Sequence, residues 1–161
     1  MPRNLLTVPL LGFLLACGAS LADQEKDARA ALDGRDFAKA RSLSEAALAG
    51  PQASSDAPGA WRLEQIRMEA LASDKQGAEL ASTLERLAGK YPTQVTAALY
   101  RSMADKLKTA GDNSGAIDVL SAGDKRFPAE HQAFVEAIEA LQQTGDLDPA
   151  EIERLKALGY M

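Results

Sequence analysis

Apolar residues between positions 98 and 128 fall into two stripes separated by a polar turn. The first stripe advances in steps of three and four residues, as one face of a helix does, through Tyr100, Met103, Ala104 and Leu107. The second stripe contains Ala116, Ile117 and Leu120, and is closed by Phe127-Pro128. Gly111 and Asp112 separate the stripes, and glycine readily adopts the left-handed conformation that ends helices. The pattern predicts two helices joined by a tight turn at Gly111.

This pattern returns after 34 residues. The matching pairs are Tyr100 with Phe134, Leu107 with Leu141, Gly111 with Gly145, Asp112 with Asp146, and Ala116 with Ala150. One shift towards the N-terminus, Gly77 matches Gly111. A fixed period of this length is typical of a helical hairpin repeated along a solenoid, in which each unit buries its apolar face against the next. We therefore expect Gly111 and Gly145 to lie at equivalent bends.

Apolar stripes and turns continue over the rest of the chain and predict four helix hairpins. The expected pairs are residues 24–32 with 37–48, 61–71 with 78–88, 96–109 with 115–126, and 130–143 with 150–158. Residues 50–59, rich in Pro, Ala, Ser and Gly, are expected to form a flexible loop. No run of β-branched residues alternates with polar ones, so the predicted fold is all-α, an α-solenoid of about four antiparallel hairpins.

The stretch that carries the period resembles the tetratricopeptide repeat family. The family pattern has a bulky aromatic residue, a small residue one turn later, a glycine–acid turn, an alanine and a closing proline. Those places are taken here by Tyr100, Ala104, Gly111-Asp112, Ala116 and Pro128. The next unit has Phe134, Gly145-Asp146 and Ala150, but Ile138 replaces the small residue and the proline is absent. The arrangement of Tyr91-Pro92, Tyr100, Gly111-Asp112 and Phe127-Pro128 is also similar to envelope-assembly repeat proteins of bacteria.

The resemblance implies a concave groove that is lined by the first helix of each hairpin and binds a protein or peptide. In the resulting register the polar residues expected to face this groove are Arg67, Arg101, Asp105, Lys108, Glu139 and Gln142. The alternative interpretation is that these are ordinary solvated side chains. Family members that clamp a peptide carboxylate use asparagines where this chain has Leu71 and Asp105, so that activity is not carried over.

The N-terminal residues 1–22 have the pattern of an export signal: Arg3 in a short polar start, then an apolar run too short to span a bilayer. Two processing sites are open. Residues 14–18 resemble a bacterial lipobox, which would make 1–16 a lipoprotein signal and Cys17 the lipidated first residue. Ser20-Leu21-Ala22 instead fits ordinary signal peptidase, which would release a repeat domain of residues 23–161. Cys17 is the only cysteine, so no disulfide is expected in the domain.

Composition narrows the partners and the chemistry. The net charge is −5 and the chain has no cluster of Lys and Arg, which argues against nucleic acid because phosphate neutralisation supplies most of that affinity. The single histidine, His131, has no second ligand at metal-binding spacing and is expected at the solvated surface. No nucleophile–base pair or glycine-rich phosphate loop can be assembled. We expect no catalytic residue, metal site or cofactor.

Together these features predict a non-catalytic exported protein of the bacterial cell envelope that acts as an adaptor or scaffold for a protein or peptide. It would be periplasmic, with contact to the outer membrane only through a lipid on Cys17. Two alternatives stay open: a structural outer-membrane lipoprotein whose repeats act as a spacer, and an accessory subunit of an envelope enzyme or assembly complex.

Overall fold

The computed structural model describes residues 19–144 and 147–161, and within these the chain is helical and contains no strand. The helices are α1 (Leu21–Asp33), α2 (Phe37–Ala49), α3 (Pro51–Ser55), α4 (Ala57–Ser73), α5 (Gly77–Lys90), α6 (Ala97–Ala110), α7 (Asn113–Arg126), the 3-10 turn η1 (Pro128–Glu130), α8 (His131–Gln142) and α9 (Pro149–Ala157). The all-α prediction is confirmed. None of the described helices is both long and apolar enough to cross a membrane.

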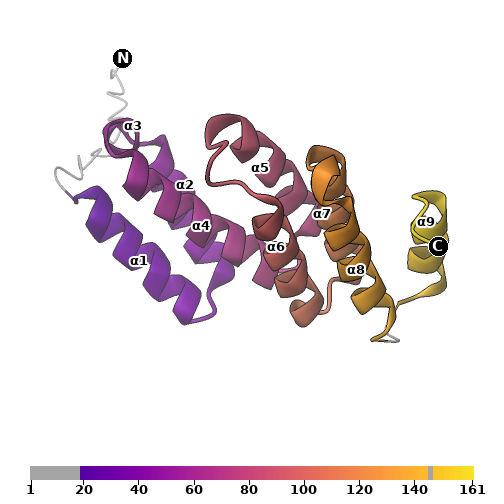
Figure 1. Cartoon of the computed structure of the whole chain (residues 1–161). Helices are drawn as coiled ribbons and strands as arrows, with labels where there is room; N and C mark the ends of the chain where they lie inside the picture. Colours follow the sequence, from indigo (N-terminus) through magenta and orange to yellow (C-terminus); the bar gives the residue numbers. More distant parts are fainter. Residues whose placement is uncertain (1–18, 145–146) are drawn as a thin grey trace, which may run out of the picture.

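The longer helices stand side by side (Figure 1). α1 contacts α4, α4 contacts α6, and α6 contacts α8, so these four helices form one row. α2 packs against α1 and α4, while α5 and α7 pack against each other behind the row. Short turns join α1 to α2 and α6 to α7 as closely packed pairs. This arrangement puts residues of α1, α4 and α6 on one face of the molecule.

Two groups of buried side chains meet at α4. Leu63, Ile66 and Ala70 face α1 and α2 in the smaller group. Met68, Leu71 and Ala72 belong to the larger group, which extends to α9. The aromatic residues that define the period, Tyr100 and Phe134, are fully buried there, as expected. Helix α4 is therefore the shared spine of both cores.

Three turns have the same backbone design, but their spacing differs from the predicted period. A residue with positive φ precedes the N-cap of the next helix in each: Arg35 (φ 61), Lys75 (φ 58) and Gly111 (φ 79), followed by Asp36, Gln76 and Asp112. Gly77 therefore comes after the cap, as the first residue of α5, whereas Gly111 comes before it. The expected equivalence of Gly77 and Gly111 is wrong. Gly145 and Asp146 lie outside the described residues, so their equivalence to Gly111 and Asp112 stays a prediction.

The C-terminal helix also departs from the predicted register. Asp148 caps α9 as Asp112 caps α7, which gives Ile152, four residues after the cap, the place of Ala116. Ala150 is exposed and does not take that place. Instead of pairing closely with α8, α9 packs mainly on α7, where Leu155 is buried. Ile152 lies two residues beyond the expected position because the connection from α8 to α9 is longer than the turn from α6 to α7.

Residues 50–59 form helical structure rather than the expected loop. Pro51 begins α3, a position where its missing N–H would have no helical partner anyway. The hydroxyls of Ser54 and Ser55 donate to the carbonyls of Pro51 and Gln52, at 2.7 and 3.0 Å, within this one short turn. Asp56 then caps α4 by accepting the backbone N–H of Gly59 at 2.9 Å. The two serines thus bond to the backbone of α3, and only Asp56 acts as a helix cap.

Helix α1 begins inside the predicted export signal. Its N-cap is Ser20 and its first residue, Leu21, is only 5% exposed. The expected boundary between residues 22 and 23 therefore falls within the first turn of α1. Residues 1–18 of the predicted signal, including Cys17, lie outside the described residues.

Candidate binding surface

A hollow of about 560 Å³ lies where α1, α4 and α6 meet. The end of α1 contributes Leu32 and Asp33, the following turn Arg35, and the start of α2 Phe37. α4 adds Glu69 and Ser73, and α6 adds Asp105, Lys106, Thr109 and Ala110. Its volume is in the range of ligand-binding clefts, and apolar surface is mixed with charges of both signs. Four helices and one turn, far apart in the sequence, thus contribute to this recess.

The charged side chains around this hollow differ in how they are partnered. Glu69 accepts a hydrogen bond from the Arg29 guanidinium of α1 at 2.9 Å, which ties α1 to α4. Asp33, Arg35, Asp105 and Lys106 are exposed and form no ion pair with another residue of the described chain. Two acids and two bases at the edge of the recess are therefore free to meet charges on a ligand.

A second, smaller hollow of about 100 Å³ lies between α6, α7 and α8. Its wall is mostly apolar, from Ala116, Leu120, Ala137 and Leu141 among others. Arg101, Asp105 and Lys108 of α6 border it, so Asp105 touches both hollows. The structure brings together these three of the six predicted groove residues.

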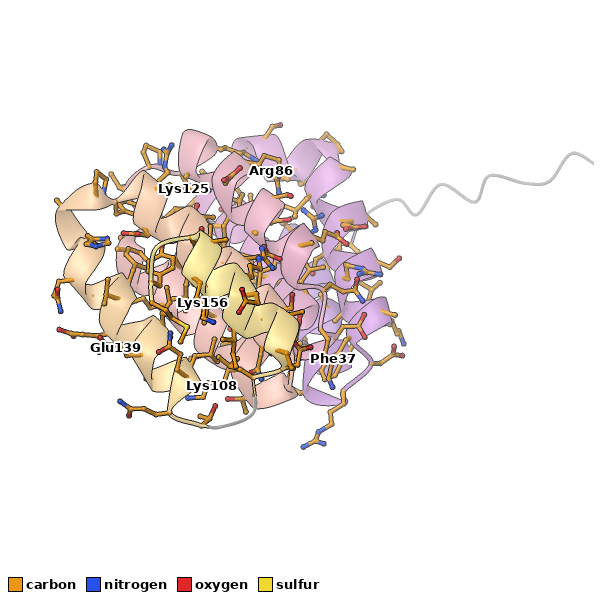
Figure 2. All side chains as sticks on the ribbon, turned by 90° about the vertical axis from the view of Figure 1, so that its right-hand side faces the viewer. Phe37, Arg86, Lys108, Lys125, Glu139 and Lys156 are labelled. Carbon is orange, nitrogen blue, oxygen red and sulfur yellow. The ribbon has the colours of Figure 1, made fainter. Side chains whose placement is uncertain are left out.

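The predicted groove residues of α6 and α8 differ in their surroundings. Arg101 is held by Glu130, which accepts from its guanidinium at 3.2 Å, and lies 5.6 Å over the ring of Phe134. Glu139 is exposed on α8, and Gln142 is half-buried near the end of that helix. Figure 2 shows Lys108 and Phe37 near one edge of the molecule and Arg86 and Lys125 near the opposite edge. Glu139 and Gln142 line neither of these two hollows.

Arg67 has a different environment from the one expected. It lies two residues from Glu69, and residues so spaced point to nearly opposite sides of a helix. Its guanidinium donates to Glu45 of α2 at 3.0 Å and to Glu79 of α5 at 3.3 Å, and its side chain is 16% exposed. The structure therefore directs Arg67 between α2 and α5 rather than into the hollow.

This ion-pair network extends to a buried acid. Glu64 of α4 is 2% exposed and accepts hydrogen bonds from Arg86 of α5, the shortest at 3.1 Å. Arg67 approaches the same carboxylate at 3.9 Å, and Arg41 of α2 reaches Glu79 at 3.6 Å. Long side chains thus connect α2, α4 and α5. The sequence pattern predicts that these residues lie on helices, but which charges pair depends on how the helices pack.

The described residues contain no group of three or more His, Cys, Asp and Glu side chains placed to hold a metal ion. His131 is exposed, as expected, but its Nδ1 lies 2.8 Å from the Asp124 carboxylate. The Tyr160 hydroxyl donates to the other oxygen of Asp124 at 2.7 Å. Burial, reinforced by this bond, raises the pKa of Tyr160 to about 12. Asp124 therefore joins α8 and the C-terminal residues to α7.

Helix α9 is also attached to α7, because the Arg154 guanidinium donates to Asp118 of α7.

No protein-family model, curated protein or solved structure matches the chain.

Proposed function

We propose that this protein is an exported, non-catalytic helical-hairpin repeat protein, similar to tetratricopeptide repeat proteins, that binds a protein or peptide partner in the bacterial cell envelope. The proposal is supported by the row of α1, α4, α6 and α8 and by the turn design shared at Arg35, Lys75 and Gly111. The apolar N-terminal segment supports export.

The hollow between α1, α4 and α6 is the observation that carries the proposal. It combines apolar surface from Leu32 and Phe37 with charges at Asp33, Arg35, Asp105 and Lys106 that the described chain leaves without ion pairs. A polypeptide segment matches this chemistry because it brings apolar side chains and charges of both signs at short intervals. Charged groups at such a rim select partners and speed association.

An exchange of neighbouring charges tests this surface. The double variant Asp105→Lys with Lys106→Asp keeps the net charge and alters two exposed residues of α6. Glu85→Lys with Lys125→Glu is the matched control, because these exposed residues belong to another hollow, between α5, α7 and α9. We expect the wild type and the control to capture the same proteins from envelope extract. The α6 variant should capture at least tenfold less of each. Equal capture by all three proteins would move the binding surface elsewhere.

A further inference from the structure

The N-cap of α1, Ser20, and its first two residues, Leu21 and Ala22, are residues that ordinary signal peptidase would remove. Ser20 and Asp23 form a reciprocal cap: the Asp23 backbone N–H donates to Ser20 Oγ at 3.2 Å, and the Ser20 N–H donates to Asp23 Oδ2 at 3.1 Å. The Ser20 hydroxyl also donates to that carboxylate at 2.7 Å. These bonds lower the pKa of Asp23. Without Ser20, the first N–H groups of α1 would lose this cap.

Leu21 attaches the same turn to α4. Its side chain belongs to the smaller core with Ala28, Leu63 and Ile66. It reaches so close to Gly59, in the first turn of α4, that a Cβ on Gly59 would lie 2.8 Å from Leu21 Cδ2. Leu21 is therefore packed closely against the start of α4. Its loss would leave a cavity in the core.

Cleavage between Ala22 and Asp23 would have three consequences for this corner. It would remove the cap and the buried Leu21 side chain together. It would also create a positive α-amino group at Asp23, where the helix dipole favours negative charge. All three effects destabilise α1 and its contact with α4.

We infer that the mature protein retains Ser20 and Leu21, so that processing takes place on the N-terminal side of Ser20. The inference rests on the proposed export, because only an exported chain is processed. Of the two sites predicted from the sequence, the one before Cys17 leaves the first turn of α1 whole and the one after Ala22 destroys it.

The direct test is the N-terminus of the mature protein. The full chain with a C-terminal tag is produced in a Gram-negative host, purified from the envelope fraction, and analysed by intact mass and N-terminal peptide mapping. A first residue from Cys17 to Ser20 is expected. A first residue at Asp23 would overturn the inference while leaving export intact. An uncleaved chain recovered from the cytoplasm would overturn the export proposal, and the processing inference with it.

A substitution in the full chain gives an independent readout. If Leu21 is retained, Leu21→Ala lowers the mass of the mature protein. It also lowers the melting temperature, by roughly 10 °C. If cleavage follows Ala22, mature protein from this variant is identical to wild type in mass and melting temperature, which would overturn the inference. Ala22→Ser is the matched control. Ala22 is exposed on α1, so this change should alter the mass and leave the melting temperature within about 2 °C.

Discussion

The carboxylate of Asp112 caps its own helix and also binds Gly77, the first residue of another. Its Oδ1 accepts the backbone N–H of Gly115 at 2.9 Å, and its Oδ2 accepts the backbone N–H of Gly77 at 3.2 Å. Both glycines are buried where α5 and α7 begin side by side. One side chain thereby fixes how the starts of α5 and α7 meet.

This meeting point has no room for a methyl group. A Cβ on Gly115 would lie 2.7 Å from the Gly77 Cα and 2.3 Å from Asp112 Oδ2. We expect Gly115→Ala to lower the free energy of unfolding by about 1–3 kcal/mol, through overpacking and loss of the cap. Urea denaturation measures the change. Gly89→Ala is the control: nothing surrounds that position in α5, so alanine should be neutral or stabilise by about 0.5–1 kcal/mol. Equal effects at both positions would contradict the close approach.

Arg35 and Lys75 adopt the left-handed conformation that Gly111 adopts in the equivalent turn. A side chain in this conformation costs about 1–2 kcal/mol relative to ordinary backbone, and glycine avoids most of it. Each of Arg35→Gly and Lys75→Gly should raise the unfolding free energy by about 0.5–1 kcal/mol, measured as a higher urea midpoint. Gly111→Ala should have the opposite sign. Loss of stability in both glycine variants would show that these turns are formed differently.

Arg67 should matter to stability rather than to binding. Arg67→Glu would set a carboxylate among Glu45, Glu64 and Glu79 in a nearly closed environment. We expect the unfolding free energy to fall by about 2–4 kcal/mol, followed by chemical denaturation. Arg62→Glu is the comparison, since Arg62 also pairs across helices, with Glu25, but is 48% exposed. Because solvent screens an exposed pair, Arg62→Glu should lower the unfolding free energy far less than Arg67→Glu does. Similar losses in the two variants would argue against a structural role specific to Arg67.

The contact between Tyr160 and Asp124 should appear as a loss of stability at alkaline pH. The pKa of Tyr160 is raised to about 12 in the folded protein, against an ordinary tyrosine value of 10.0. Between these values the unfolded chain holds fewer protons than the folded one, so stability falls as pH rises through this window. Tyr160→Phe should lower stability near pH 8, where it removes one hydrogen bond, and should reduce the further fall between pH 10 and 12. Urea midpoints at pH 8, 10 and 11.5 provide the comparison.

Some of the alkaline fall should persist in Tyr160→Phe, because burial also raises the pKa of Tyr100. A pH dependence of the variant that matches the wild type would mean that Tyr160 is not held against α7.

The apolar stripes located the helices well because their residues face a core directly. Tyr100, Leu107 and Phe134 are all fully buried, and spacing of three and four residues is enough to find such positions. The positions of equivalent residues in the turns were harder to predict from the sequence. Matching glycine to glycine paired Gly77 with Gly111, although a left-handed turn accepts arginine or lysine when the surrounding helices impose it. Residue type alone could not separate a glycine needed for close packing from one needed for its backbone conformation.

The candidate surface was predictable only in part. One region contains Arg101, Asp105 and Lys108, because their spacing of four and three residues places them on one face of α6. The hollow lined by Arg35 and Lys106 depends on the relative placement of four helices, which no local sequence pattern contains. Arg67 shows the same difficulty, because its partners Glu45 of α2 and Glu79 of α5 lie 22 and 12 residues away in the sequence.

Site-specific photo-crosslinking tests the proposed binding face most directly. A benzoylphenylalanine residue replaces Lys106 beside the hollow in one full-length protein and Lys125 near the opposite edge in another. After irradiation of intact cells, we predict a discrete adduct of higher mass from the Lys106 position and none from the Lys125 position. Adducts formed only from Lys125, or equally from both, would contradict binding on the face formed by α1, α4 and α6.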